Sequence, residues 1–277
     1  KIVHPALDLF VHRSYGLPNL PEHDLRERLI ICASYSGNTE ETLDAFRAAK
    51  ASRLPLAVMS TGGALLAYAK EAKVPYVCLP KTPGLQPRLS LGLQLMALLA
   101  LMGKKEEMRS VAALAHTLRA QDTEAQGKEL AQKLHLKVPV IYASLKNASL
   151  AYTWKIKYNE TAKIPAFANV FPELNHNEMT GFDAVTGTRA LSKSFAVVIL
   201  RDEEDHPRIL ARMRVTKALY EKRGIAVHEI TMRGVSPWHK IMNTLLLADW
   251  TAYYLALFYG VEPNEVPMVE EFKKKIV

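Results

Sequence analysis

The chain has 277 residues, which corresponds to about two domains and is enough to bury a hydrophobic core without disulfides or a structural metal. Apolar residues make up 49% of it and charged residues 23%, a balance that excludes wholesale disorder. The 36 Lys and Arg against 28 Asp and Glu leave a net charge of +8, which admits nucleic acid, anionic membranes or anionic small molecules as partners. Because the basic residues are spread out in short mixed runs, we expect no nucleic-acid partner, and we expect no membrane partner either.

Three features point to a cytoplasmic protein. No stretch has the apolar length of a membrane span; the nearest, Leu89–Met102, is short and interrupted by polar residues. The two cysteines, Cys32 and Cys78, lie in apolar runs that predict buried strands, which suits a reducing compartment better than a disulfide does. The chain shows no secretory signal and begins as though in the middle of a domain, so we expect that its true beginning is missing.

Short apolar runs alternate with helical patterns along the first hundred residues. The expected strands cover residues 29–34, 55–60 and 75–79, and the expected helices cover residues 39–50, 64–72 and 89–102. Continuous apolar strands between helices are typical of a parallel sheet that is covered on both faces.

A polar helical stretch over residues 104–137 separates this region from a second one with the same alternation. There the expected strands cover residues 138–143, 195–200 and 224–230, and the expected helices cover residues 206–223, 237–259 and 266–276. We therefore predict an α/β protein of two domains, residues 1–125 and 126–277, each a parallel sheet flanked by helices. The two halves are candidates for diverged copies of one fold.

The segment that says most about function follows the first strand and opens the next helix. Residues 34–42 read Ser-Tyr-Ser-Gly-Asn-Thr-Glu-Glu-Thr. A parallel sheet places such a loop at its carboxyl edge, where ligands of open α/β sheets bind, and the helix N-terminus offers free N–H groups and partial positive charge. The hydroxyls of Ser34, Ser36 and Thr39 add donors, and Gly37 allows close approach. Together they predict a phosphate site that needs no metal.

The simpler alternative for this segment is a helix N-cap. Asn38 or Thr39 could cap the helix, with Glu41 or Thr42 completing the capping motif. A cap uses one hydroxyl, however, and three at this spacing are more than it needs. We therefore favour phosphate binding.

This loop closely resembles the sugar-phosphate loop of sugar isomerase (SIS) domains, and a second region narrows the resemblance. Asn-Glu-x-Ala-Lys at residues 159–163 and Glu-Leu-Asn-His-Asn-Glu at residues 173–178 resemble the bifunctional phosphoglucose/phosphomannose isomerases of archaea and bacteria. Residues 200–207, 249–257 and 260–263 fit the same family, so the resemblance covers most of the chain from Tyr15 onward. It implies two SIS-type subdomains, each a parallel sheet flanked by helices.

The resemblance also implies an activity without a cofactor. Family members interconvert glucose 6-phosphate and fructose 6-phosphate through a cis-enediol, and mannose 6-phosphate is a further substrate that the resemblance leaves open. Glu160 matches the base that moves a proton between C1 and C2. His176 matches the ring-opening histidine, which family members supply across a dimer interface. A homodimer with a shared active site is therefore expected.

Two cations complete the implied site. Arg88 matches the arginine that stabilises the enediolate, a task that suits a side chain that stays charged and presents a planar fork of donors. Lys273 matches a lysine that assists ring opening, although the alignment could slip to Lys274 or Lys275 and a solvated helix face is an equal alternative. The implied phosphate ligands are Ser34, Ser36 and Thr39.

The catalytic candidates have simpler interpretations when each is taken alone. Glu160 would be a surface carboxylate paired with Lys157 or Lys163, His176 a loop or cap histidine, and Arg88 a surface arginine. Only the motifs around them favour catalysis. The histidines are scattered, with no His-x-x-x-His and no Cys-x-x-Cys, so the zinc site of unrelated phosphomannose isomerases is not supported.

The chain departs from the family in two places. A Gly-Gly-Ser-Ala loop, which follows the first strand in family members and contacts the sugar phosphate, has no counterpart between Lys1 and Phe10. We expect that the first strand and this loop are absent from the chain, by truncation or by loss. Near the end, residues 264–266 read Asn-Glu-Val in place of a threonine-containing turn, which puts the breadth of aldose substrates in question.

Two other functions fit an SIS protein. One is a non-catalytic sugar-phosphate sensor or regulator, but we see no helix-turn-helix domain, and a binder needs neither Glu160 nor His176. The other is a different SIS reaction, such as an amino-sugar phosphate isomerase, against which the Asn-Glu-x-Ala-Lys motif argues.

Overall fold

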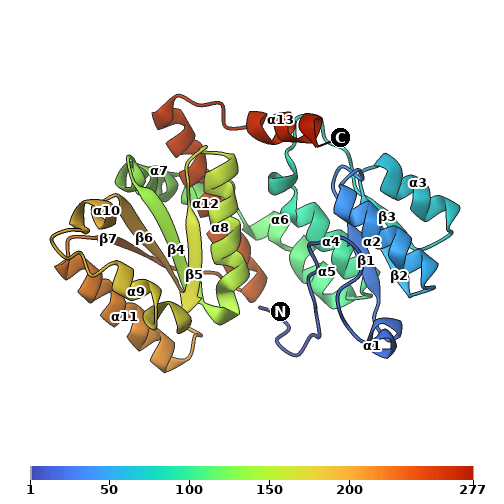
Figure 1. Ribbon diagram of the computed structural model, residues 1–277, viewed down its shortest axis with the longest axis horizontal. Coiled ribbons are helices and arrows are strands. Elements are labelled where there is room, and N and C mark those ends of the chain that lie inside the picture. Colours follow the sequence, from blue (N-terminus) through green and yellow to red (C-terminus); the bar gives the residue numbers. More distant parts are fainter. Residues whose placement is uncertain (1, 277) are drawn as a thin grey trace. The chain divides into compact units, whose positions relative to one another are not determined.

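The computed structural model describes residues 2–276 and divides into two compact units. One unit is Leu7–Ala113, and the other combines the residues up to Ala6 with those from Leu114 on. Each unit contains one parallel sheet with helices packed on it (Figure 1). This arrangement confirms the predicted α/β class.

The sheet of the first unit has the order β1-β2-β3. Its elements are α1 (Glu22–Arg26), β1 (Ile30–Ala33), α2 (Glu40–Ala51), β2 (Leu56–Ser60), α3 (Gly63–Glu71), β3 (Tyr76–Cys78), the 3-10 helix η1 (Pro87–Leu89), α4 (Leu91–Leu101) and α5 (Lys105–Ala112). Every residue of β2 is buried, because Val58 packs with the core formed with α2 and α3 while Met59 packs on the other side with α4. Burial on both faces explains the continuous apolar run.

The sheet of the second unit has the order β5-β4-β6-β7, again all parallel. Its elements are α6 (Leu114–Thr117), η2 (Ala120–Thr123), α7 (Glu124–Leu134), β4 (Val138–Ser144), η3 (Leu145–Asn147), α8 (Ala148–Glu160), β5 (Phe167–Phe171), η4 (Glu173–Asn175), α9 (Glu178–Gly181), α10 (Arg189–Lys193), β6 (Phe195–Arg201), α11 (Pro207–Lys222), β7 (Ala226–Thr231), α12 (Pro237–Tyr259) and α13 (Pro267–Lys275). The central strands β4 and β6 are almost wholly buried, as expected for the strands predicted there.

The boundary between the units lies about one helix earlier than the sequence suggests. Residues 114–125, expected in the N-terminal domain, belong to the second unit because α12 holds them. Trp250 Nε1 donates to the carbonyl of Ala120 at 2.7 Å, and Tyr254 Oη donates to Glu124 Oε1 at 2.6 Å. Gly127 on α7 lets the two helices approach closely, since a Cβ there would lie 2.4 Å from the Cβ of Trp250.

Two elements that lead to the candidate site, β5 and α8, were not among the expected strands and helices. β5 is an edge strand whose Phe167 is exposed, so it lacks the uninterrupted apolar pattern of β4 and β6. α8 buries the polar residue Lys157 beside Trp154 and Tyr158, which obscures its helical pattern of apolar residues. These two elements carry Glu160 and lead to His176.

α12 corrects the prediction that no segment reaches the apolar length of a membrane span. It has 23 residues, and its length and composition would allow it to cross a membrane. Half of its most apolar window is buried within the protein, however, and the helix packs on α7 and α8. This is the pattern of a core helix, which passes the same test of length and composition.

The two cysteines have different environments. Cys32 in β1 is buried, and burial raises the pKa of its thiol to about 12. Cys78 is exposed, because β3 is an edge strand of its sheet. The prediction of a buried position is therefore confirmed for Cys32 and wrong for Cys78. Both are free thiols.

Candidate active site

Three hydroxyl groups gather where β1 ends and α2 begins. The Oγ atom of Ser34, a buried residue, lies 2.7 Å from Thr39 Oγ1 and 3.5 Å from Ser36 Oγ. α2 has twelve residues, so its N-terminus has the free N–H groups and partial positive charge of a full helix. The predicted phosphate ligands are thus brought together at the carboxyl edge of the first sheet.

The structure argues against the simple capping alternative for this segment. Thr39 is the N-cap residue of α2, but its side chain makes no capping hydrogen bond, and its hydroxyl contacts Ser34 instead. The Asn38 side chain accepts a hydrogen bond from the backbone N–H of Ala64 at 3.0 Å, at the start of α3. Neither candidate cap residue therefore uses its side chain to cap the N-terminus of α2.

A second loop, at residues 60–63, holds the loop of residues 34–39 in shape. Thr61 donates to the carbonyl of Tyr35 through its Oγ1 at 2.7 Å and through its N–H at 3.0 Å. Gly37 has a φ of +73°, and a Cβ at this position would lie 1.9 Å from the carbonyl oxygen of Gly62. The run Ser-Thr-Gly-Gly at residues 60–63, directly after a buried strand, was the signal that could have identified this partner.

Arg88 lies in η1, in the chain that follows β3. Its residue exposure is only 7%, so the surface arginine of the simpler interpretation is not what the structure shows. The turn around it is braced, because Ser90 Oγ donates to the Pro87 carbonyl at 2.8 Å and Gln94 Nε2 donates to Ser90 Oγ at 2.7 Å. A buried guanidinium on a braced turn is a fixed positive charge in the same unit as the phosphate loop.

Glu160 is the last residue of α8 and is half-buried. Lys157, one of its two suggested ion-pair partners, is buried and pairs instead with Asp249 of α12. Lys163, the other, donates from Nζ to the main-chain carbonyl of Glu160 at 2.8 Å. Glu160, the candidate base, therefore lies at the C-terminal end of α8, where Lys163 of the same motif binds its main-chain carbonyl.

His176 is exposed and follows η4, beyond the end of β5. Its loop is shaped by the polar residues of the surrounding motif. Asn175 Nδ2 donates to Thr216 Oγ1 on α11 at 2.8 Å, and Asn177 Nδ2 donates to Glu173 Oε1 at 2.8 Å. The first contact holds the loop on α11 and the second lies within the loop, while His176 itself stays exposed.

Glu178, the last residue of the motif, anchors the same loop to the sheet. Tyr142 Oη on β4 donates to Glu178 Oε1 at 2.5 Å, and Asn169 Nδ2 on β5 donates to Glu178 Oε2 at 2.5 Å. Burial raises the pKa of Tyr142, so this phenol remains a neutral donor. The sequence alone did not indicate Tyr142 or Asn169 as partners of the motif.

Glu160 and His176 lie at opposite ends of the strands of the second sheet. Glu160 is near the end where β5 starts, and His176 is near the end where it finishes. Because β4 and β5 are parallel, α8 returns the chain to the edge where β5 starts, while His176 follows the end of β5 (Figure 1). The five residues of β5, at about 3.3 Å each, span about 16 Å. One chain therefore does not bring these two side chains together.

Lys273 lies on α13 with its side chain 62% exposed, and its Nζ pairs with Glu270 Oε1 at 2.7 Å. The partner is one turn earlier on the same helix. This arrangement is that of the solvated helix face named as the alternative for this residue.

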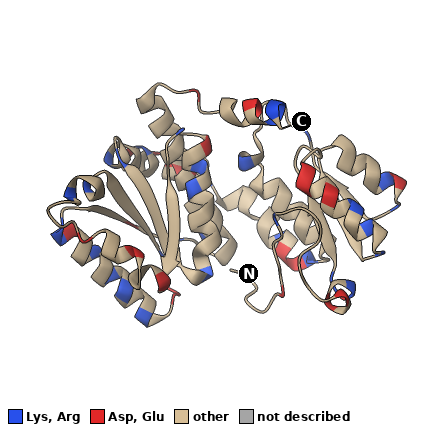
Figure 2. Ribbon diagram, in the orientation of Figure 1, with Lys and Arg blue, Asp and Glu red and all other residues tan. Residues whose placement is uncertain are grey.

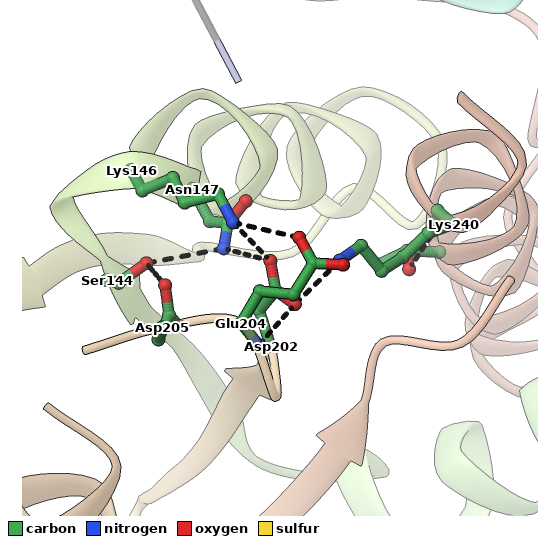
Figure 3. A network of polar contacts seen from close by, with 8 residues as sticks. Ser144, Lys146, Asn147, Asp202, Glu204, Asp205 and Lys240 are labelled. Atoms are coloured by element: carbon green, nitrogen blue, oxygen red, sulfur yellow. Dashed lines mark hydrogen bonds and ion pairs between the residues drawn. The ribbon is translucent and has the colours of Figure 1, made fainter. Parts of the chain in front are cut away.

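The carboxyl edge of the second sheet, in contrast to the first, carries acidic side chains (Figure 3). Asp202 follows β6, and its carboxylate accepts from Lys240 Nζ at 2.7 Å and from Lys146 Nζ at 3.1 Å. Burial alone would raise the pKa of Asp202, but hydrogen bonds from Lys240, the Glu204 N–H, Lys146 and Asn147 lower it to about 2.

Two further carboxylates join this network. Lys240 Nζ lies 3.0 Å from Glu204 Oε1, and Ser144 Oγ donates to Asp205 Oδ1 at 2.6 Å. The two lysines at this edge therefore pair with Asp202 and Glu204 within the chain, whereas Oδ2 of Asp205 is buried without a hydrogen-bond partner in the described part of the chain. The ionised carboxylate of Asp202 disfavours an anion at this edge, whereas the corresponding edge of the first sheet carries the hydroxyl cluster.

Among residues 2–276, no three His, Cys, Asp or Glu side chains gather as metal ligands would. A hollow of about 280 Å³ lies between α7 and β7 and is lined by residues such as Lys133 and His228. None of the predicted site residues lines it.

Comparison with known proteins places this chain in a family. Residues 123–276 match the family described as the bacterial phospho-glucose isomerase C-terminal SIS domain. The chain is similar to a bifunctional phosphoglucose/phosphomannose isomerase of Aquifex aeolicus (33% identity over 96% of this chain and 81% of the relative) and to one of Caldicellulosiruptor bescii (34% identity over 98% and 81%). The crystal structure of glucosamine-6-phosphate deaminase from Thermotoga maritima has a similar fold, with a TM-score of 0.64 and 19% identity over 91% of this chain and 75% of that one.

Proposed function

Because this chain belongs to the family of bifunctional phosphoglucose/phosphomannose isomerases, we propose that it interconverts glucose 6-phosphate and fructose 6-phosphate through a cis-enediol. It is an enzyme of the isomerase class, and its substrate is a sugar phosphate. The observation that carries the proposal is the cluster of Ser34, Ser36 and Thr39 hydroxyls at the N-terminus of α2. Mannose 6-phosphate is the second aldose of the proposal, since the relatives are named for both activities.

The chemistry of the proposal needs one base and one stabilising charge. The Glu160 carboxylate takes the proton from C2 of the open-chain aldose and returns it to C1 on the same face of the cis-enediol, while the hydroxyl proton of O2 passes to O1. Arg88 stabilises the negative charge that develops on the enediolate oxygens. Its buried position strengthens such an interaction, because the local dielectric is lower than that of water.

We propose that the active site is shared between two chains of a homodimer. His176 opens the sugar ring held by the partner subunit, and Lys273 assists this step. The separation of Glu160 and His176 by the length of β5 supports a shared site, as does the exposure of His176. A cytoplasmic location also belongs to the proposal, and the two free cysteines fit a reducing compartment.

The test of the proposed function is conversion of the substrate in deuterated water. We expect the wild-type protein to convert glucose 6-phosphate to fructose 6-phosphate and to place solvent deuterium at C2 of the recovered aldose, measured by NMR. A protein that binds glucose 6-phosphate without conversion or exchange would instead be a sugar-phosphate sensor. Mannose 6-phosphate in the same assay gives the breadth of aldose use.

Removing one phosphate-loop hydroxyl is expected to weaken substrate binding. Ser36→Ala should raise KM for glucose 6-phosphate about tenfold, the effect of one hydrogen bond to a charged group, and lower kcat less, because the phosphate is remote from the reacting carbons. Inorganic phosphate should inhibit the variant less strongly in parallel.

Ser110→Ala is the matched control, since this exposed serine of the same unit donates to the Glu106 carbonyl at 3.0 Å. Steady-state kinetics on both variants provide the comparison. An unchanged KM in the triple variant Ser34→Ala, Ser36→Ala and Thr39→Ala would show that the phosphate binds elsewhere.

A further inference from the structure

The ammonium of Lys163 is bound to the main chain at the end of α8. Its Nζ donates to the carbonyl oxygens of Glu160 at 2.8 Å and Thr161 at 3.3 Å. The last carbonyls of a helix lack partners within the helix, and a cation there is favourable to the helix dipole. Lys163 thus stabilises the helix end on which Glu160 is carried.

The same ammonium also reaches the linker between α12 and α13. It donates to the carbonyl of Pro263 at 3.3 Å, across 100 residues of sequence. Pro263 lies directly before Asn264 in this linker. One side chain therefore joins the main chain of Glu160 to the main chain of the linker.

The backbone of Lys163 shows that this arrangement has a cost. Its φ is +58°, in the left-handed region, which costs about 1 kcal/mol for a residue that has a Cβ and is usually taken by glycine or asparagine after a helix. The turn itself is held by other groups, since Asn159 Nδ2 donates to the Ile164 carbonyl at 2.9 Å. The conformation of the turn therefore does not depend on a lysine at this position. The three hydrogen bonds to carbonyl oxygens do depend on its ammonium.

We propose that Lys163 is a positioning residue for catalysis, which holds Glu160 and the Pro263–Asn264 main chain in fixed relative positions. This inference rests on the proposed isomerase function. Lys163 acts through the main chain of Glu160, so its loss lowers the rate of proton transfer and leaves binding of the phosphate unchanged. The physical reason is that proton transfer needs the carboxylate within about 3 Å of C1 and C2, and an error of about 1 Å costs on the order of a hundredfold in rate.

Three variants separate the ammonium from the backbone. Lys163→Met removes the charge, Lys163→Asn removes it while favouring the left-handed backbone, and Lys163→Arg keeps a cation that can reach carbonyl oxygens. We expect the Met and Asn variants to lose about tenfold to a hundredfold in kcat, with KM and inhibition by inorganic phosphate unchanged. The Arg variant should recover a large part of the lost rate.

Lys137→Met is the matched control, because Lys137 Nζ donates to the carbonyl of Lys193 at 2.7 Å in the same unit without contacting the Glu160 motif. It should keep the wild-type kcat. Urea unfolding of each variant shows whether it is folded, and the folded Asn variant keeps the test open if the Met variant fails to fold.

The outcomes are distinct. Wild-type kcat in the folded Asn variant would overturn the positioning role, and so would a loss of kcat that Arg does not relieve. A rise in KM equal to the fall in kcat would also overturn it, because this would indicate general damage to the fold. A wild-type protein that neither converts nor exchanges glucose 6-phosphate would refute the proposed function itself, which the same assay reveals before any variant is compared.

Discussion

Glu160→Gln is expected to lower kcat for the isomerisation of glucose 6-phosphate by about a hundredfold to ten-thousandfold, with KM little changed. Glutamine keeps the shape of the side chain but cannot accept the proton from C2, so the base is removed while the phosphate loop stays intact. Exchange of the C2 hydrogen with deuterated water should fall in parallel, because exchange and isomerisation share the proton abstraction. Coupled kinetics and NMR exchange on one preparation measure both.

Mixing this variant with His176→Ala tests the shared site. In a heterodimer of the two variants, one site receives both substitutions and the other receives neither. Statistical reassociation should therefore restore about a quarter of the wild-type activity. If both residues of a site came from one chain, mixing would restore nothing. A pure Glu160→Gln enzyme with wild-type kcat would refute the role of this residue as the base.

Asp202→Asn is expected to destabilise the protein by about 3–5 kcal/mol, the usual cost of removing one partner of a buried ion pair. Asp202 is 1% exposed, and its loss leaves the Lys240 ammonium, itself largely buried, without its main counter-charge. Urea unfolding at neutral pH measures the change. Lys240→Met in the same chain should recover part of the loss, since it removes the charge that is left uncompensated.

The stabilisation by Asp202 depends on pH in a defined direction. Its pKa falls from 3.8 to about 2 on folding, so the contribution is complete above pH 3.8 and disappears as the pH falls from 3.8 toward 2. The difference between wild type and Asp202→Asn should shrink over this range. Asp183→Asn is the control, because Asp183 is half exposed in its pair with Arg223 and should change stability by less than about 1 kcal/mol. An equal effect of the two substitutions would contradict the buried network.

The charge distribution differs locally between the carboxyl edges of the two sheets. Lys, Arg, Asp and Glu are scattered over the helices of both units, as the short mixed runs in the sequence suggested (Figure 2). At the carboxyl edge of the second sheet, Asp202 and Glu204 after β6 form a local acidic pair bound to Lys240. In the first unit the equivalent edge carries the Ser34 hydroxyl cluster, which suits an anion.

Local patterns in the sequence were sufficient for the central strands and for the cluster of hydroxyls at the start of α2. Strands such as β2 and β4 are buried on both faces, and an uninterrupted apolar run is the direct record of such burial. The loop at residues 34–39 was recognisable because its hydroxyls and glycine are close in sequence and follow a strand. The motif around Glu160 and His176 was recognisable as a resemblance before any contact was known.

Tertiary structure alone decided the features that depend on distant partners. β5 was missed because an exposed edge strand has no strict apolar pattern, and the unit boundary moved because α12 binds residues 120–124 from 130 residues away. Contacts between distant segments also produced three features of the candidate site. These are the hydrogen bonds from Thr61 to Tyr35, the hydrogen bond from Lys163 to Pro263, and the placement of Glu160 and His176 at opposite ends of the strands. A sequence records the propensity and burial of each segment, whereas contacts between segments far apart exist only after the chain has folded.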